Sequence, residues 1–112
     1  MSTKSYQAQG KTQADGAFEL DVPRPDVARR VTVQFTFYDS NGDVDDPAAG
    51  TVEIQARLGH AVEFEEMVGN VIDVTDRAQW LQTFEIAGCR KLKFTPDSVT
   101  AGATYDVYVS AV

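Results

Sequence analysis

Oxygen-bearing side chains recur at alternate positions in residues 39–46, and this spacing is one that can bind calcium. The ligand positions of an EF-hand loop would fall on Asp39, Asn41, Asp43 and Asp45. The other positions fit poorly, because Val44 stands where the sharp turn needs glycine and Gly50 stands where a bidentate glutamate is needed. The segment is better interpreted as a hairpin tip with solvated acids, built on the turn dipeptide Asn41-Gly42. A weak calcium site is the alternative.

One cysteine and one histidine are the candidates for nucleophilic chemistry. Cys89 follows Gly88, which indicates a turn, and His60 lies in a separate turn after Gly59. A cysteine nucleophile needs a histidine beside it, and nothing in the sequence brings these two together. We therefore expect Cys89 to be a small residue, half-buried at a strand edge.

Paired carboxylates occur at Asp45-Asp46 and Glu65-Glu66, but adjacent residues of a strand point to opposite faces. Such pairs are poor candidates for a glycosidase pair, which needs two carboxyl groups that converge on one bond. The sequence also lacks a Ser-His-Asp context, a phosphate-binding glycine loop and a Cys/His cluster for zinc. We expect no enzyme activity, no cofactor, and no catalytic, cofactor-binding or metal-ligating residues.

Trp80, the only tryptophan, lies beside Gln79 and Gln82 in the least regular segment. It has two interpretations: a plug for the open end of the fold, which we favour, or a platform on which a sugar stacks. Burial of its ring would favour the plug. Among the tyrosines, Tyr108 is expected to face outward and to be the one that touches a partner.

Alternation of apolar and polar residues predicts the elements that hold these side chains. It is clearest in residues 31–38, 51–58 and 104–112. The first two are predicted to pair as an antiparallel hairpin with a long acidic tip. Weaker patterns predict a turn at Met67–Asn70 before a short strand at 71–74.

Residues 76–81 break the alternation and are expected to form one helical turn capped by Thr75 or Asp76. In all, seven or eight short strands and no long helical period predict an all-β fold, an antiparallel β-sandwich or jelly-roll-like barrel. We expect a single domain over residues 17–112, preceded by a polar, extended N-terminal arm at residues 1–16. The predicted core consists of Val33, Phe35, Phe37, Val52, Ile54, Phe84, Ile86, Leu92, Phe94, Val107 and Val109.

Length and charge narrow the function. A chain of 112 residues with a net charge of −7 has too few clustered basic residues for nucleic-acid binding. No run is long enough to span a membrane, and the N-terminus lacks the apolar region of a signal peptide. The protein is thus expected in the cytoplasm, or outside the cell after lysis.

The polar N-terminal segment and the ending at Lys93–Pro96 and Ala103–Val109 resemble small virion proteins of tailed bacteriophages. These include head decoration, head-fibre base and tail accessory proteins. The similarity covers mainly Phe84–Val112 and, more loosely, Val31–Leu58.

The resemblance implies a non-enzymatic structural protein of the virion, assembled in the host cytoplasm. It would decorate or stabilise a capsid or tail, with the major capsid protein or another virion protein as partner, and it would form homo-oligomers. In such families the terminal arm reaches onto a neighbouring subunit. The alternatives are a carbohydrate-binding module or host-recognition accessory domain, and a bacterial protein of the same fold with another role.

Overall fold

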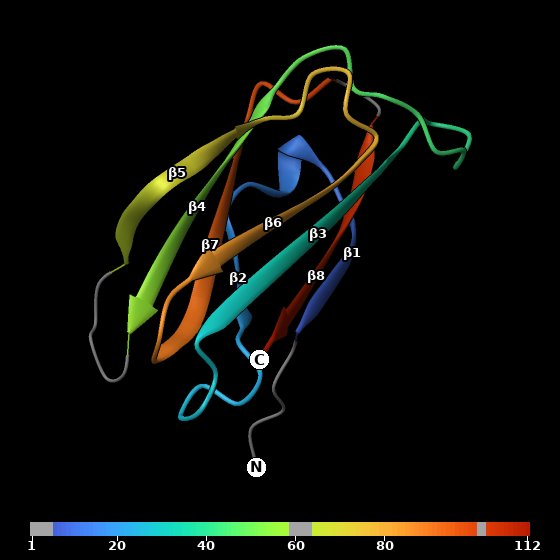
Figure 1. Ribbon diagram of the computed structural model, residues 1–112. Helices are drawn as coiled ribbons and strands as arrows, with labels where there is room; N and C mark the ends of the chain where they lie inside the picture. The colour runs from blue at the N-terminus through green and yellow to red at the C-terminus, as the bar shows by residue number, and fades with distance from the viewer. Residues whose placement is uncertain (1–5, 59–63, 101–102) are drawn as a thin grey trace.

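Two four-stranded antiparallel sheets, packed face to face, make up the fold in the computed structural model (Figure 1). The structure describes residues 6–58, 64–100 and 103–112, without the side chains of residues 65–70. The strands are β1 (Gln7–Lys11), β2 (Phe18–Asp21), β3 (Arg30–Tyr38), β4 (Thr51–Leu58), β5 (Glu65–Asp73), β6 (Gln79–Glu85), β7 (Cys89–Asp97) and β8 (Thr104–Ala111). A short 3-10 turn, η1 (Gln13–Asp15), precedes β2.

The strand order is that of one long hairpin rolled into two layers. Sheet A has the order β1-β8-β3-β6 and sheet B the order β2-β7-β4-β5. The first strand therefore pairs with the last, the second with the seventh, the third with the sixth and the fourth with the fifth. This is the eight-stranded jelly-roll arrangement of two Greek keys. The predicted all-β sandwich is confirmed.

Period-two alternation places the apolar residues between the sheets, because successive side chains of a strand point to opposite faces. Of the eleven residues predicted for the core, ten are buried and Ile86 is half-buried against them. The buried set also includes residues outside that prediction, among them Leu20, Val22, Val74, Val99 and Tyr105.

Aromatic rings from both sheets meet around Phe35, which is fully buried on β3. Its ring stacks on Trp80 of β6 with the centroids 4.1 Å apart. It meets Phe94 of sheet B edge-on at 5.8 Å and Tyr105 of β8 at 6.1 Å. Such contacts stabilise the fold beyond the area that they bury. The Tyr105 hydroxyl is also buried and has no hydrogen-bond partner among the described residues, and burial raises its pKa.

The predicted hairpin between residues 31–38 and 51–58 is wrong, although both strands exist. β3 belongs to sheet A and β4 to sheet B, so the connection between them crosses from one layer to the other. Alternation shows which residues face the core but not which strand is the neighbour. The tight turn at Asn41-Gly42 is present, with Gly42 at φ +84°, and it returns along β3 only as a single bridge between Tyr38 and Val44.

Two local predictions in the middle of the chain are also wrong. The backbone at Met67–Asn70 is not a turn but part of β5, which carries extra residues in a bulge: Glu53 lies opposite Val71 and Gln55 opposite Glu66. The expected helical turn at residues 76–81 is absent. Asp76 takes a positive φ of +59°, which does not continue a right-handed helix, and β6 begins at Gln79.

The N-terminal segment differs from the separate arm that was expected. Gln7–Lys11 is extended, but it forms the edge strand β1 and pairs with β8. The turn that follows is also fixed to the domain, because the Gln13 side chain donates to the Pro96 carbonyl at 3.1 Å and accepts from the Val99 amide at 2.9 Å. Apolar patterning does not reveal that this segment is attached to the domain, because the attachment consists mainly of backbone and side-chain hydrogen bonds. Residues 1–5 lie outside the described part of the chain.

Replacing Phe35 by alanine should lower the free energy of unfolding by about 3–5 kcal/mol, because it removes a buried ring and leaves a cavity. Urea denaturation measures the change. The adjacent Gln34→Ala exchange is the matched control, since Gln34 is exposed on the other side of β3, and it should change stability by less than about 0.5 kcal/mol. Equal effects of the two exchanges would contradict the assigned core.

Deleting residues 1–11 should lower the melting temperature by more than about 4 °C, because the deletion exposes the edge of β8 and removes hydrogen bonds of the ladder. Thermal unfolding followed by circular dichroism measures this. A shorter deletion of residues 2–5, which keeps β1, is the control. An unchanged melting temperature after the longer deletion would show that the segment is a separable arm.

Candidate functional site

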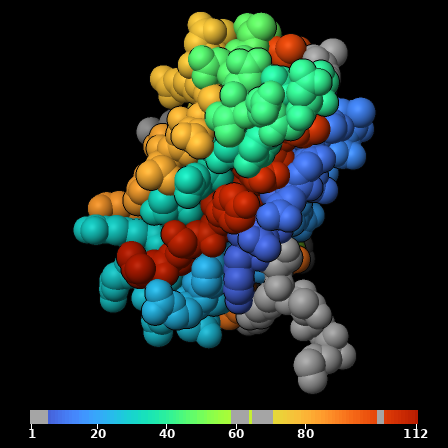
Figure 2. Space-filling view, turned by 90° about the vertical axis from the view of Figure 1, so that its right-hand side faces the viewer, coloured from blue at the N-terminus to red at the C-terminus, as the bar shows by residue number. Residues whose placement is uncertain are grey.

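The outer faces of the two sheets differ in charge. On sheet A, two neighbouring rows across β8, β3 and β6 are uncharged: one joins Ser110, Thr32 and Thr83, and the other joins Tyr108, Gln34 and Leu81. We call these six residues the neutral face. Figure 2 shows the four strands of sheet A side by side on this surface. In a chain with a net charge of −7, this is a surface with little electrostatic repulsion against a second protein.

Individual side chains of the neutral face are open to solvent or bonded to one another. Leu81, on the edge strand β6, is 64 % exposed and presents a large apolar side chain to solvent. Thr32 and Thr83 share a hydrogen bond of 2.9 Å between their hydroxyls, and Tyr108 accepts one from Gln9 at 3.3 Å. The predicted outward orientation of Tyr108 agrees with its half-buried position on β8. Charges return only near the ends of the strands, as in the ion pair of Arg30 with Glu85.

The outer face of sheet B is densely charged. Lys91 lies between two acids of β2, with its Nζ 3.8 Å from Asp21 and 4.0 Å from Glu19. Glu53 and Arg57 alternate on β4. Exposed pairs of this kind contribute little to stability, so this face is described better as solvated than as a contact surface.

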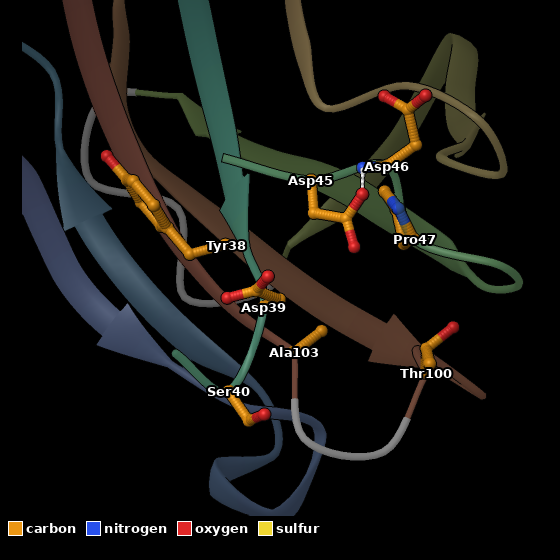
Figure 3. A pocket seen from close by; sticks show the side chains of 8 residues that line it. All are labelled: Tyr38, Asp39, Ser40, Asp45, Asp46, Pro47, Thr100 and Ala103. Atoms are coloured by element: carbon orange, nitrogen blue, oxygen red, sulfur yellow. Dashed lines mark hydrogen bonds between the residues drawn. The ribbon is translucent and has the colours of Figure 1, made fainter. Parts of the chain in front are cut away.

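The connection between β3 and β4, which carries Asp39, Asp45 and Asp46, lines a pocket of about 200 Å³ at one end of the sandwich (Figure 3). Its walls are Tyr38, Asp39, Ser40, Asp45, Asp46, Pro47, Thr100 and Ala103. In Figure 3 the carboxylate of Asp46 points away from those of Asp39 and Asp45.

Two of these acids hold the backbone of the loops. Asp39 accepts hydrogen bonds from the amides of Asn41 and Asp43 at 2.8 and 3.0 Å, and Asp46 accepts one from the amide of Ala78 at 2.8 Å. The carboxylates of Asp39 and Asp46 therefore have a structural role, which is to hold the backbone of these turns in place. In the part of the chain that the structure describes, no group of three or more His, Cys, Asp or Glu side chains could hold a metal ion.

A second pocket, also of about 200 Å³, opens on sheet B and was not foreseen from the sequence. We call it the basic pocket; it is lined by Asp21, Val22, Pro25, Arg57, Arg90 and Lys91. Sequence alternation would place Arg90 and Lys91 on opposite faces. In the structure both side chains line one pocket because β7 contains a bulge, and the residue pattern does not predict this bulge.

Cys89 begins β7 and is almost fully buried, at 1 % exposure, rather than half-buried as expected. Its thiol lies 3.5 Å from the carbonyl oxygen of Lys91. Burial raises the pKa of the thiol to about 11. His60, the only histidine, lies outside the described residues. The Cys89 environment disfavours the thiolate that nucleophilic chemistry requires.

Trp80 is half-buried and stacks on Phe35, so its ring packs into the sandwich instead of forming a surface platform. Its indole N–H is buried and has no hydrogen-bond partner among the described residues. This placement favours the plug interpretation over sugar stacking. Trp80 lies on the edge strand β6, so it closes the side of the sandwich at that edge.

Fold and surface together define a jelly-roll β-sandwich with one neutral and one charged outer face. The chain belongs to the family described as a domain of unknown function, DUF7265, whose match covers residues 9–112. The match begins within β1 and so includes the second half of the predicted N-terminal arm, residues 9–16. No curated protein matches the chain. No helix among the described residues is long and apolar enough to cross a membrane. The family description assigns no function, so the resemblance to virion proteins stays a prediction.

The Cys89 thiol should react with a thiol reagent at least about 100-fold more slowly in the folded protein than in urea near pH 8, because a rise of its pKa from 9.0 to about 11 lowers the thiolate fraction by that factor. The thiol proton of Cys89 is also bound more tightly in the folded protein than in the unfolded chain. The stabilisation that this proton contributes to the folded state is therefore lost as the pH rises from about 9 to about 11. Ellman's reagent and urea titrations measure the two effects, and Cys89→Ala is the control. Equal labelling of folded and unfolded protein would contradict the assigned burial.

Proposed function

We propose that this protein is a non-enzymatic structural protein that assembles through protein–protein contacts made by the neutral face of sheet A, and that it works on a virus particle. Its partners would be further copies of itself and another virion protein. The observation that carries the proposal is the neutral face, two adjoining uncharged rows on the outer side of one sheet, in a chain with a net charge of −7.

The composition of the neutral face supports this role. Tyr108 and Leu81 flank Gln34 in one row of the sheet. Tyrosine is enriched at protein interfaces, and charged residues are depleted at their centres. The jelly-roll architecture adds support at the level of fold alone, because it recurs in viral capsid domains. It recurs in lectins as well, so fold does not separate the virion role from carbohydrate binding.

Carbohydrate binding is the competing function, and one observation weakens it. The only tryptophan packs on Phe35 inside the fold, which leaves the neutral face with Tyr108 as its aromatic side chain. A sugar site there would depend on Tyr108 and neighbouring amides. A glycan array tests it directly: binding that is lost in Tyr108→Ala would establish the carbohydrate function in place of the assembly function.

Gln34→Asp should weaken self-association because it places a charge at the centre of the neutral face, and sedimentation velocity over a range of concentrations measures the effect. Gln55→Asp is the matched control, since Gln55 is the outward residue near the middle of β4 in sheet B and the exchange is chemically identical. We expect wild type and Gln55→Asp to form oligomers, with dissociation of Gln34→Asp shifted to at least about tenfold higher concentration. A monomeric wild type, or equal effects of both exchanges, would contradict assembly through this face.

The genes beside this one test the virion assignment separately. Neighbouring genes for a major capsid protein or a terminase would support it, and a neighbourhood without virion genes would count against it.

A further inference from the structure

The basic pocket is built by an irregularity in the pairing of β4 with β7. Arg57 lies opposite Lys91, and the next residue, Leu58, lies opposite Cys89. One step along β4 therefore corresponds to two steps along β7, and Arg90 is the extra residue. Cys89 remains in the core, while Arg90 and Lys91 both line the pocket beside Arg57. A bulge of this kind redirects a side chain that a regular strand would send to the other face.

The three cations are not equivalent. Arg90 Nη2 is 2.9 Å from an oxygen of Asp26, and Lys91 Nζ is 3.8 Å from an oxygen of Asp21. For Arg57, the described residues supply no ion pair. Its guanidinium lies over the ring of Phe64 at 5.2 Å, and its Nε is buried without a hydrogen-bond partner. A buried donor left unpaired is unfavourable, so an acceptor that reaches Arg57 would gain a full hydrogen bond.

The shape of this cation favours one kind of acceptor. The guanidinium of Arg57 lies over the ring of Phe64, 5.2 Å from its centroid, and its planar fork of donors matches the two oxygens of a carboxylate. Among the described side chains, Arg57 is the one cation of the pocket without an acidic partner, and a single positive charge matches a monoanion better than a phosphate dianion. The pocket volume of about 200 Å³ is enough for a carboxylate and a few carbon atoms.

We propose that the basic pocket is a binding site for a carboxylate group, in which Arg57 donates from Nε, and Arg90 and Lys91 line the site beside it. The carboxylate belongs to a free small organic acid or to an acidic side chain of a bound protein. The site lies on the sheet opposite the neutral face and does not depend on the proposed function.

Nuclear magnetic resonance of the whole ¹⁵N-labelled chain tests the site, because each arginine Nε–H gives its own signal. Sodium acetate is titrated against sodium chloride at constant ionic strength. We expect a saturable shift of the Arg57 Nε–H signal and of the Arg90 and Lys91 backbone amides, with no saturable shift at Arg29. A capped glutamate residue is the second probe: tighter binding than acetate would assign the carboxylate to a protein side chain, and equal or weaker binding would assign it to a free acid.

Two variants complete the test. Arg57→Gln should lower the affinity for acetate at least about tenfold, as read from the Lys91 amide, because it removes a charged donor. Arg29→Gln, a charge-matched exchange at an exposed position away from the pocket, should leave the affinity unchanged. If Arg57→Gln does not fold, the Arg57 signal of the wild type decides alone. No shift of that signal, or the same linear shift at every arginine, would overturn the proposal.

Discussion

Contact between the two sheets through the ring of Phe35 is the interaction on which the rest of the structure depends. This ring is fully buried and touches aromatic residues of β6, β7 and β8, so it joins an edge strand, a central strand and the opposite layer at one point. A domain of this size has a small core, and a few large side chains supply much of its buried area. With the layers held in this way, each outer face is free to differ in composition without altering the fold.

The independence of the outer faces explains why one chain carries two unlike surfaces. On β3, inward valine and phenylalanine alternate with outward threonine and glutamine. On β4 and β7, the inward residues are similar, but the outward ones include lysine, arginine and glutamate. The core therefore places no requirement on charge, and the neutral face of sheet A cannot be explained by folding alone.

The fold class could be predicted from the sequence, but the order in which the strands pair could not. Alternation identified β3, β4 and the inward side chains, because a strand with one buried face must repeat every second residue. It could not show that β3 and β4 belong to different layers, since both arrangements bury the same residues. Trp80 was assigned to a broken pattern, although it continues the inward row of β6 with Gln82 and Phe84. No pattern in the sequence indicates the basic pocket, because the pocket depends on a bulge in β7 that shifts Arg90 out of alternation.

The rolled hairpin also has a consequence for biosynthesis. Of the eight strands in the described ranges, β4 and β5 alone pair as neighbours in sequence, whereas β1 must wait for β8, which is synthesised last of the eight. Strands made early thus remain without partners for most of translation, and sheets dominated by distant pairings fold slowly once the chain is complete. Unpaired strand edges promote aggregation during that interval. The net charge of −7 makes unfolded copies of this chain repel one another. This repulsion opposes their aggregation before the fold is complete.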